Sequence, residues 1–125
     1  SISADEPGRI TSANSIKENE AIFDIAPASF VELEPIIMNA GTILWNGPIG
    51  FFEKENFFAG TAMIAKMIIS SKGFSVAGGG DTISAAEKAG VLDSLDYVST
   101  AGGAFLEFME GKKLPALEAL IDKVN

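Results

Sequence analysis

Short apolar runs alternate with segments of helical periodicity along most of the chain. The runs have the length of buried strands and occupy residues 42–45, 74–77 and 97–100. Apolar residues at helical spacing, with proline or glycine near the ends, predict helices at residues 56–70, 82–89, 104–110 and 115–123. Buried strands that alternate with helices pair in parallel through right-handed crossovers. The pattern therefore predicts an α/β fold with a parallel sheet.

The first 40 residues are less regular. Residues 1–20 are polar and aperiodic, which predicts a surface connection. The apolar run at 21–25 has the composition of a further short strand. A helix with a kink at Pro35 is expected at residues 28–39. The apolar residues of this helix are spaced for one face and are Phe30, Leu33 and Ile37.

Loops that contain glycine follow all three predicted strands. They lie at residues 46–50, 78–80 and 101–103. The carboxyl ends of parallel strands meet at one edge of the sheet, where ligands collect in such folds. Unpaired N–H groups and the positive end of the helix dipole at a helix start can hold phosphate. The alternative for each cluster is a tight turn in which glycine only supplies a positive φ.

Asp81 directly follows the triple glycine. Its carboxylate could hold Mg²⁺ or could cap the helix, and the residues alone leave both explanations open. Thr82 adds a hydroxyl and an N–H group. Around the first loop, Asn46 is interpreted as a partner of nearby backbone groups and Glu53 as a surface charge. Trp45 lies within an apolar run and is predicted to be buried.

The composition limits the chemistry that is possible. The chain has no Cys and no His, so any acid, base or metal ligand must be a carboxylate. A net charge of −8 argues against a nucleic-acid surface, and no apolar run reaches the roughly 18 residues of a membrane span. Three carboxylates near the first strand are expected to face solvent, namely Glu18, Glu20 and Asp24.

Known phosphate-binding fingerprints do not fit. A G-x-G-x-x-G that starts at Gly78 fails at Ile83, and no G-x-x-x-x-G-K-[ST] occurs. The only arginine is Arg9, and the lysine that follows the triple glycine, Lys88, lies near the far end of the predicted helix. Phosphoryl transfer normally uses such cations. The chain therefore offers a backbone cradle for phosphate without the cations.

Three motifs, in this order and spacing, resemble the phosphoglycerate kinase family in a bacterial form. They are Trp45 to Glu53 (WNGPIGFFE), Gly78 to Thr82 (GGGDT) and Ser99 to Glu107 (STAGGAFLE), followed by Glu110 to Pro115 (EGKKLP). The resemblance runs from about Ile25 to the C-terminus. It implies a three-layer doubly wound parallel sheet of Rossmann-like type. Residues 1–125 would form only the C-terminal part of the nucleotide-binding domain, without the N-terminal substrate domain.

The resemblance also implies roles for individual residues. Asp81 would hold Mg²⁺, and Glu53 would take the ribose hydroxyls. Gly80 and Gly103 would direct N–H groups at the phosphoryl group that is transferred. The residues that would contact ATP or ADP are Asn46 near the phosphates, Pro48 and Phe51 beside base and sugar, Glu53, Gly79, Gly80, Asp81 and Thr82.

The family's full-length enzyme transfers a phosphoryl group reversibly between 1,3-bisphosphoglycerate and MgADP in glycolysis. By this resemblance the parent would be a cytoplasmic monomer that binds nucleotide and 3-phosphoglycerate, with no nucleic-acid or membrane partner. Ser1 begins the chain without Met, which is expected of a piece of a longer protein. The piece alone is expected to be inactive, because the family's phosphate-contacting lysines and substrate domain are missing from it.

Two residues depart from the family pattern. Ala101 stands where glycine is usual, and Phe51 stands where a smaller aliphatic residue is usual. Ala101 could narrow the anion site, and Phe51 could alter contacts with the base. The alternative to a kinase segment is a stand-alone phosphate-binding or interaction module that performs no chemistry.

Overall fold

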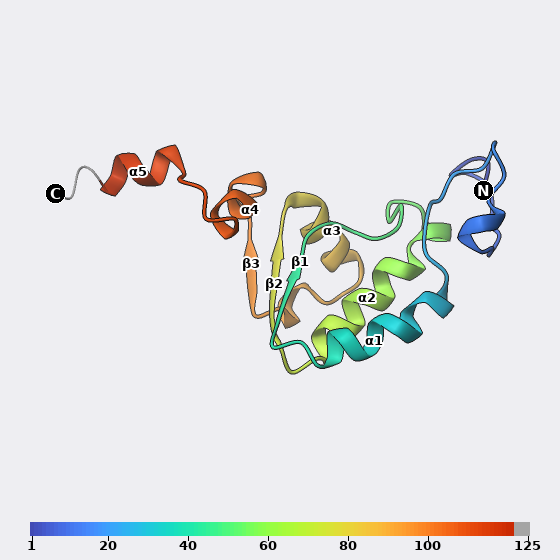
Figure 1. Cartoon of the computed structure of the whole chain (residues 1–125), viewed down its shortest axis with the longest axis horizontal. Coiled ribbons are helices and arrows are strands. Elements are labelled where there is room, and N and C mark those ends of the chain that lie inside the picture. Colours follow the sequence, from blue (N-terminus) through green and yellow to red (C-terminus); the bar gives the residue numbers. More distant parts are fainter. Residues whose placement is uncertain (122–125) are drawn as a thin grey trace.

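The computed structural model describes residues 1–121 and contains one parallel sheet (Figure 1). Its strands are β1 (Thr42–Trp45), β2 (Phe74–Gly78) and β3 (Tyr97–Ser99), in the order β1-β2-β3. Thr42 pairs with Phe74, and Gly78 pairs with Ser99. The three predicted strands and their parallel pairing are confirmed. The chain is thus an α/β protein with a Rossmann-like parallel sheet.

The helices within these residues follow the predicted ones closely. They are α1 (Phe30–Met38), α2 (Ala59–Ser70), α3 (Gly80–Lys88), α4 (Gly103–Met109) and α5 (Pro115–Ile121). The α-helix expected from residue 56 begins at Ala59, because residues 55–57 form a 3₁₀ turn instead. The expected end of the last helix, at residue 123, lies outside the described residues. None of the described helices combines the length and apolar character that crossing a membrane requires.

The predicted strand at residues 21–25 is wrong. The segment lies outside the sheet, and its backbone hydrogen bonds join it to two separate parts of the chain, Ser1 and Phe51. The Ala21 N–H donates to the Ser1 carbonyl, and the Phe23 carbonyl accepts from the Phe51 N–H at 2.7 Å. A short apolar run carries no information about its partner, so its composition could not distinguish a strand from this packed extended segment.

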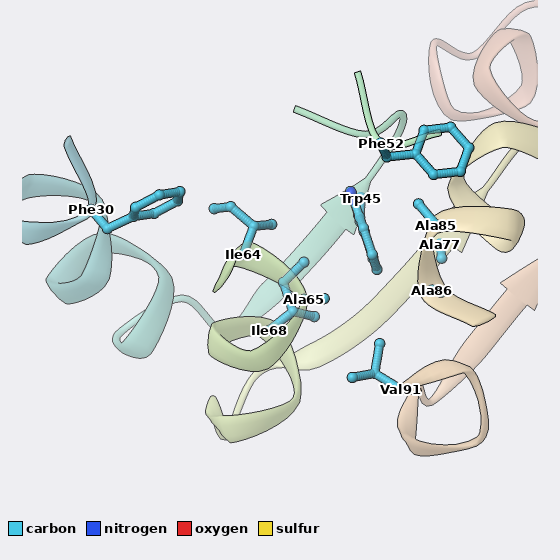
Figure 2. Packing of buried hydrophobic residues seen from close by; sticks show 10 residues of the cluster. All are labelled: Phe30, Trp45, Phe52, Ile64, Ala65, Ile68, Ala77, Ala85, Ala86 and Val91. Carbon is cyan, nitrogen blue, oxygen red and sulfur yellow. The ribbon is translucent and has the colours of Figure 1, made fainter. Parts of the chain in front are cut away.

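The core lies between one face of the sheet and helices α2 and α3 (Figures 1 and 2). Trp45 of β1 and Ala77 of β2 meet Ile64 and Ile68 of α2, and Ala85 of α3 completes the layer. Trp45 is therefore buried, as predicted. Both helices connect consecutive strands, and crossovers of one hand place them on the same face for this strand order.

The second face of the sheet is open within residues 1–121 except at its carboxyl end, where Phe105 of α4 packs against Gly78. Strand side chains alternate between the faces, and those on the second face include Leu44, Phe74 and Tyr97. These side chains are 43%, 53% and 53% exposed, respectively. A three-layer arrangement covers this face with further helices. The described residues therefore supply the sheet, the helix layer on one side of it, and only a small part of the cover on the other.

Two of the three carboxylates expected to face solvent are instead engaged. Glu20 accepts a hydrogen bond from Arg9 Nε at 2.6 Å, and this pairing with Arg9 lowers the pKa of Glu20 to about 2. Asp24 is half-buried and accepts a hydrogen bond from the Gly60 N–H at 2.9 Å. Only Glu18 is exposed as predicted. Contacts with residues distant in the chain decide which of these carboxylates are engaged. The spacing of the acidic residues in the sequence does not encode such contacts.

Asp96 ties the starts of β2 and β3 together through hydrogen bonds to Ser75. Its carboxylate accepts the Ser75 N–H at 2.8 Å and the Ser75 hydroxyl at 2.7 Å, and these bonds lower the pKa of Asp96. A carboxyl whose pKa is lower in the folded state stabilises the fold above its unfolded pKa. This stabilisation is lost as the pH falls through the folded value.

We therefore expect Asp96→Asn to lower the free energy of unfolding at pH 7. Below about pH 4, the free energy of unfolding of this variant should fall less steeply with pH than that of the wild type. Denaturant unfolding of both proteins across this pH range measures the effect. The matched control is Asp93→Asn, because Asp93 is exposed and makes no side-chain hydrogen bond among residues 1–121. Equal pH slopes for wild type and Asp96→Asn would contradict the expectation.

Candidate functional site

The start of α3 presents three backbone N–H groups without protein acceptors. Gly79 precedes the helix with φ of +95°, a conformation that glycine adopts readily, and its carbonyl accepts the first helical bond, from Ile83 N at 3.1 Å. The N–H groups of Gly80, Asp81 and Thr82 have no acceptor among the described residues. A Cβ at Gly80 would meet nothing within 4 Å. This helix start is therefore open to an anion, as the glycine pattern predicts.

Asp81 lies in the first turn of α3 and is exposed. The helix has no side-chain cap hydrogen bond, so the alternative in which Asp81 caps it is not supported. No group of three acidic side chains that could hold a metal occurs within residues 1–121. Mg²⁺ is often bound through one or two carboxylates, with substrate phosphates and water as the other ligands. A single exposed carboxylate beside an anion site fits that mode of binding.

The Thr82 hydroxyl is not available to a ligand, in contrast to the expectation from sequence. The side chain is only 1% exposed. Its Oγ1 donates to the Gly78 carbonyl at 2.7 Å and accepts from the Gly47 N–H at 2.7 Å. The hydroxyl thus joins the glycine loop after β2 to the loop after β1. Only the N–H group of Thr82 remains free for binding.

Asn46 lies beside this helix start. Its side-chain oxygen is 3.7 Å from the position that a Cβ at Gly79 would take. The side chain makes no hydrogen bond among the described residues, so its interpretation as a partner of nearby backbone groups is wrong. Trp45 also bonds to this loop, because its Nε1 donates to the Gly47 carbonyl at 2.9 Å. The Asn46 amide is thus free at the edge of the anion site.

Further along this loop lie the other residues singled out from the sequence. Phe51 is 39% exposed, and its ring centroid lies 6.2 Å from that of Phe23. Glu53 is exposed, as the surface-charge interpretation expects, and Pro48 is half-buried. Sequence reasoning missed Phe23, because its apolar run was assigned to a strand. Phe51 and Glu53 belong to the loop after β1, whereas Phe23 comes from the extended segment at residues 21–25 and packs against Phe51.

The loop after β3 forms a second helix start next to the first. Gly79 N–H donates to the Ser99 carbonyl at 3.4 Å, and Phe105 of α4 packs against Gly78. The N–H groups of Gly102 and Gly103 have no acceptor among the described residues, whereas Ala104 N bonds to the Ala101 carbonyl. The structure therefore brings the two glycine clusters together at one edge of the sheet.

The two cations discussed from the sequence, Lys88 and Arg9, make contacts away from the glycine clusters. Lys88 Nζ donates to the Phe52 carbonyl at 2.6 Å and lies 3.3 Å from a Glu55 carboxylate oxygen. It also sits 4.4 Å from the centroid of the Phe58 ring. Arg9 pairs with Glu20. Lys88 thus holds the far end of the loop that contains Glu53, and neither side chain reaches the glycine clusters.

The residues that surround the α3 start are accessible, because Asn46, Gly80 and Asp81 are all exposed. Two hollows of about 520 and 530 Å³ occur elsewhere, and the α3 start lines neither of them. The first lies between residues 1–29 and the turn that contains Phe57, and the second lies among β3, α4 and α5. A ligand at the α3 start would therefore be held mainly by backbone N–H groups and by the loop after β1.

Comparison with known proteins gives a consistent match. A family model described as phosphoglycerate kinase matches residues 1–112. Phosphoglycerate kinase from Coxiella burnetii is 48% identical, with a TM-score of 0.78 over 84% of this chain and 27% of that chain. The enzyme from Pyrococcus horikoshii OT3 is 42% identical, with a TM-score of 0.71 over 80% of this chain and 24% of that chain. The chain thus spans about a quarter of the length of these structures.

Proposed function

The chain belongs to the phosphoglycerate kinase family, and on this premise we propose that it is the C-terminal part of the nucleotide-binding domain of such a kinase. The full-length protein would transfer a phosphoryl group between 1,3-bisphosphoglycerate and MgADP in either direction. Its partners would be these small molecules, and it would act as a monomer in the cytoplasm. The N-terminal substrate domain would come from the part of the relatives that this chain does not span.

One observation carries the proposal. Free N–H groups at the starts of α3 and α4 converge at one edge of the sheet, and Asp81 stands beside them. Fixed N–H donors of this kind stabilise charge on a phosphoryl group without reorganising during the reaction. The N–H groups of Gly80 and Gly103 would face the transferring phosphoryl group. The N–H groups of Gly79 and Thr82 would face the nucleotide phosphates. The Gly79 N–H also donates a hydrogen bond to the Ser99 carbonyl.

Residues of the loop after β1 would orient the nucleotide. Asn46 is free and next to Gly79, so its amide can reach a phosphate. Glu53 is exposed, and its carboxylate can accept hydrogen bonds from the ribose hydroxyls. Phe51 and Pro48 offer apolar surface beside the base and the sugar. Phe51 is large for this position in the family, and the ring of Phe23 supports it.

Asp81 would hold Mg²⁺ together with the nucleotide phosphates. Bound there, the metal would offset negative charge on the phosphate oxygens. The role of this chain is to fix the carboxylate at the first turn of α3, where the neighbouring N–H groups also point toward the anion. None of the ion pairs in the described residues brings a lysine or arginine to the α3 start, so lysines from the rest of the full-length protein would complete the site.

A coupled assay of the full-length protein tests the proposal. With MgATP and 3-phosphoglycerate, we expect turnover in the range of about 1–100 s⁻¹ that depends on Mg²⁺. Acetate in place of 3-phosphoglycerate is the control acceptor, because it has the carboxylate but lacks the phosphate that a basic substrate domain would recognise. Absence of turnover, or equal rates with both acceptors, would count against a phosphoglycerate kinase.

A further inference from the structure

Every backbone N–H group in the loop Gly47–Gly50 is held by a buried threonine. The Gly47 N–H donates to Thr82 Oγ1 at 2.7 Å. The N–H groups of Ile49 and Gly50 both donate to Thr61 Oγ1, each at 3.2 Å. Pro48, the remaining residue of this loop, has no N–H group. Two hydroxyls therefore account for all the amide hydrogens of the segment.

The two threonines are the largest side chains that are fully buried in the described residues. Thr61 is 0% exposed and Thr82 is 1% exposed. Thr61 stands in the first turn of α2, and Thr82 stands in the first turn of α3. A hydroxyl oxygen can accept two hydrogen bonds, so one buried side chain can hold two consecutive amides. The loop is thus fastened to two different helices through side chains that water does not reach.

This arrangement contrasts with that of the glycine clusters. Those clusters leave N–H groups free for an anion, whereas the Gly47–Gly50 loop has none to offer. In the proposed function it contributes to a ligand through side chains, namely Asn46 before it, Pro48 within it, and Phe51 and Glu53 after it. The position of these side chains depends on the shape of the loop, and the shape depends on the two hydroxyls.

We propose that Thr61 and Thr82 act through their hydroxyls as positioning residues, which hold the Gly47–Gly50 loop so that its flanking side chains face the nucleotide. Thr61 would touch no ligand, and its removal would act through the loop. This inference rests on the proposed function, because it assigns the loop to nucleotide binding. It identifies two buried hydroxyls behind the binding surface that control the position of the side chains on that surface.

Two substitutions at Thr61 separate the hydroxyl from the side-chain volume. Thr61→Val keeps the shape and leaves the Ile49 and Gly50 amides without an acceptor, whereas Thr61→Ser keeps the acceptor. In the full-length protein we expect Thr61→Val to raise the Kd and KM for MgADP by roughly tenfold or more. The KM for the phosphoglycerate substrate should stay unchanged, because the proposed function assigns that substrate to the N-terminal domain and not to the loop. Thr61→Ser should restore MgADP binding.

The matched control is Ser75→Ala. Ser75 is also buried, and its hydroxyl bonds to Asp96 at the amino end of β2, on the opposite edge of the sheet from the loop. This variant should lose stability and keep the nucleotide KM of the wild type. A purely structural role for Thr61 would make the two variants behave alike.

Hydrogen exchange gives a second measurement that does not depend on activity. In wild type, the Ile49 and Gly50 amides should be protected from exchange like the amides of α2. Thr61→Val should remove the protection of these two loop amides, while the amides of α2 keep theirs. Unprotected wild-type amides would overturn the inference, even where Thr61→Val does not fold. An unchanged MgADP affinity in a folded Thr61→Val protein would also overturn it. Absence of MgADP binding by wild type would instead refute the proposed function.

Discussion

Replacing Asp81 with asparagine in the full-length protein is expected to lower kcat by at least about a hundredfold. The fold should be kept, because Asp81 is exposed and its side chain makes no hydrogen bond among the described residues. Asn keeps the size and one oxygen but loses the negative charge that Mg²⁺ prefers. The next acidic residue along α3 is Glu87, about two turns away, so no neighbour on that helix can replace the lost carboxylate.

The measurement is kcat at saturating nucleotide, with Mg²⁺ varied over a wide range. Asp93→Asn is the matched control, since it makes the same change in charge at an exposed position that precedes β3, away from the strand ends that carry the site. We expect the control to keep the kcat of the wild type. A near wild-type kcat for Asp81→Asn at saturating Mg²⁺ would exclude the metal role of this carboxylate.

The 125-residue chain by itself is expected to bind MgADP with a Kd in roughly the millimolar range, about 4 kcal/mol of binding, and to show no kinase turnover. The α3 start supplies N–H donors and one carboxylate on a single side of the ligand. Lys88 and Arg9 are committed to other contacts. The net charge of −8 also opposes the approach of an anionic nucleotide, so Mg²⁺ must provide much of the attraction.

Binding is measured by titration of the purified chain with MgADP, and turnover by the coupled assay. The same chain with Asp81→Asn is the control for contaminating host enzyme, because activity that survives this change does not come from the proposed site. Turnover that is present in the wild-type chain and absent from the variant would contradict the prediction. It would mean that these residues contain a complete active site.

Much of the candidate site could be predicted because its signals are local. A strand that ends in glycine and continues into a helix leaves N–H groups free at the helix start, and this follows from backbone geometry at Gly79 and Gly102. The parallel order of the strands then brings such helix starts to one edge. Asp81 was recognisable since it follows the glycines directly. The motifs also identified the family, which the comparisons confirmed.

The contacts that hold the loop could not be predicted. Thr61 lies within the apolar helical pattern of residues 56–70, and nothing near it in the sequence reveals that its hydroxyl faces Ile49 and Gly50. Thr82 was singled out, but as a ligand group rather than as a link between two loops. The assignment of residues 21–25 to a strand failed for the same reason. Each depends on a partner distant in the chain.

The sequence by itself determined the α/β class and the places where strands end in glycine, because these follow from local backbone rules. Its composition also excluded His and Cys from the chemistry of these 125 residues. Tertiary structure alone decided which polar groups are hydrogen-bonded within the fold and which remain available to a ligand. Thr82 Oγ1 is hydrogen-bonded within the fold, and the Asn46 amide remains available. Hydrogen-bond partners are chosen by three-dimensional proximity and burial, and a side chain's type specifies only that it needs a partner.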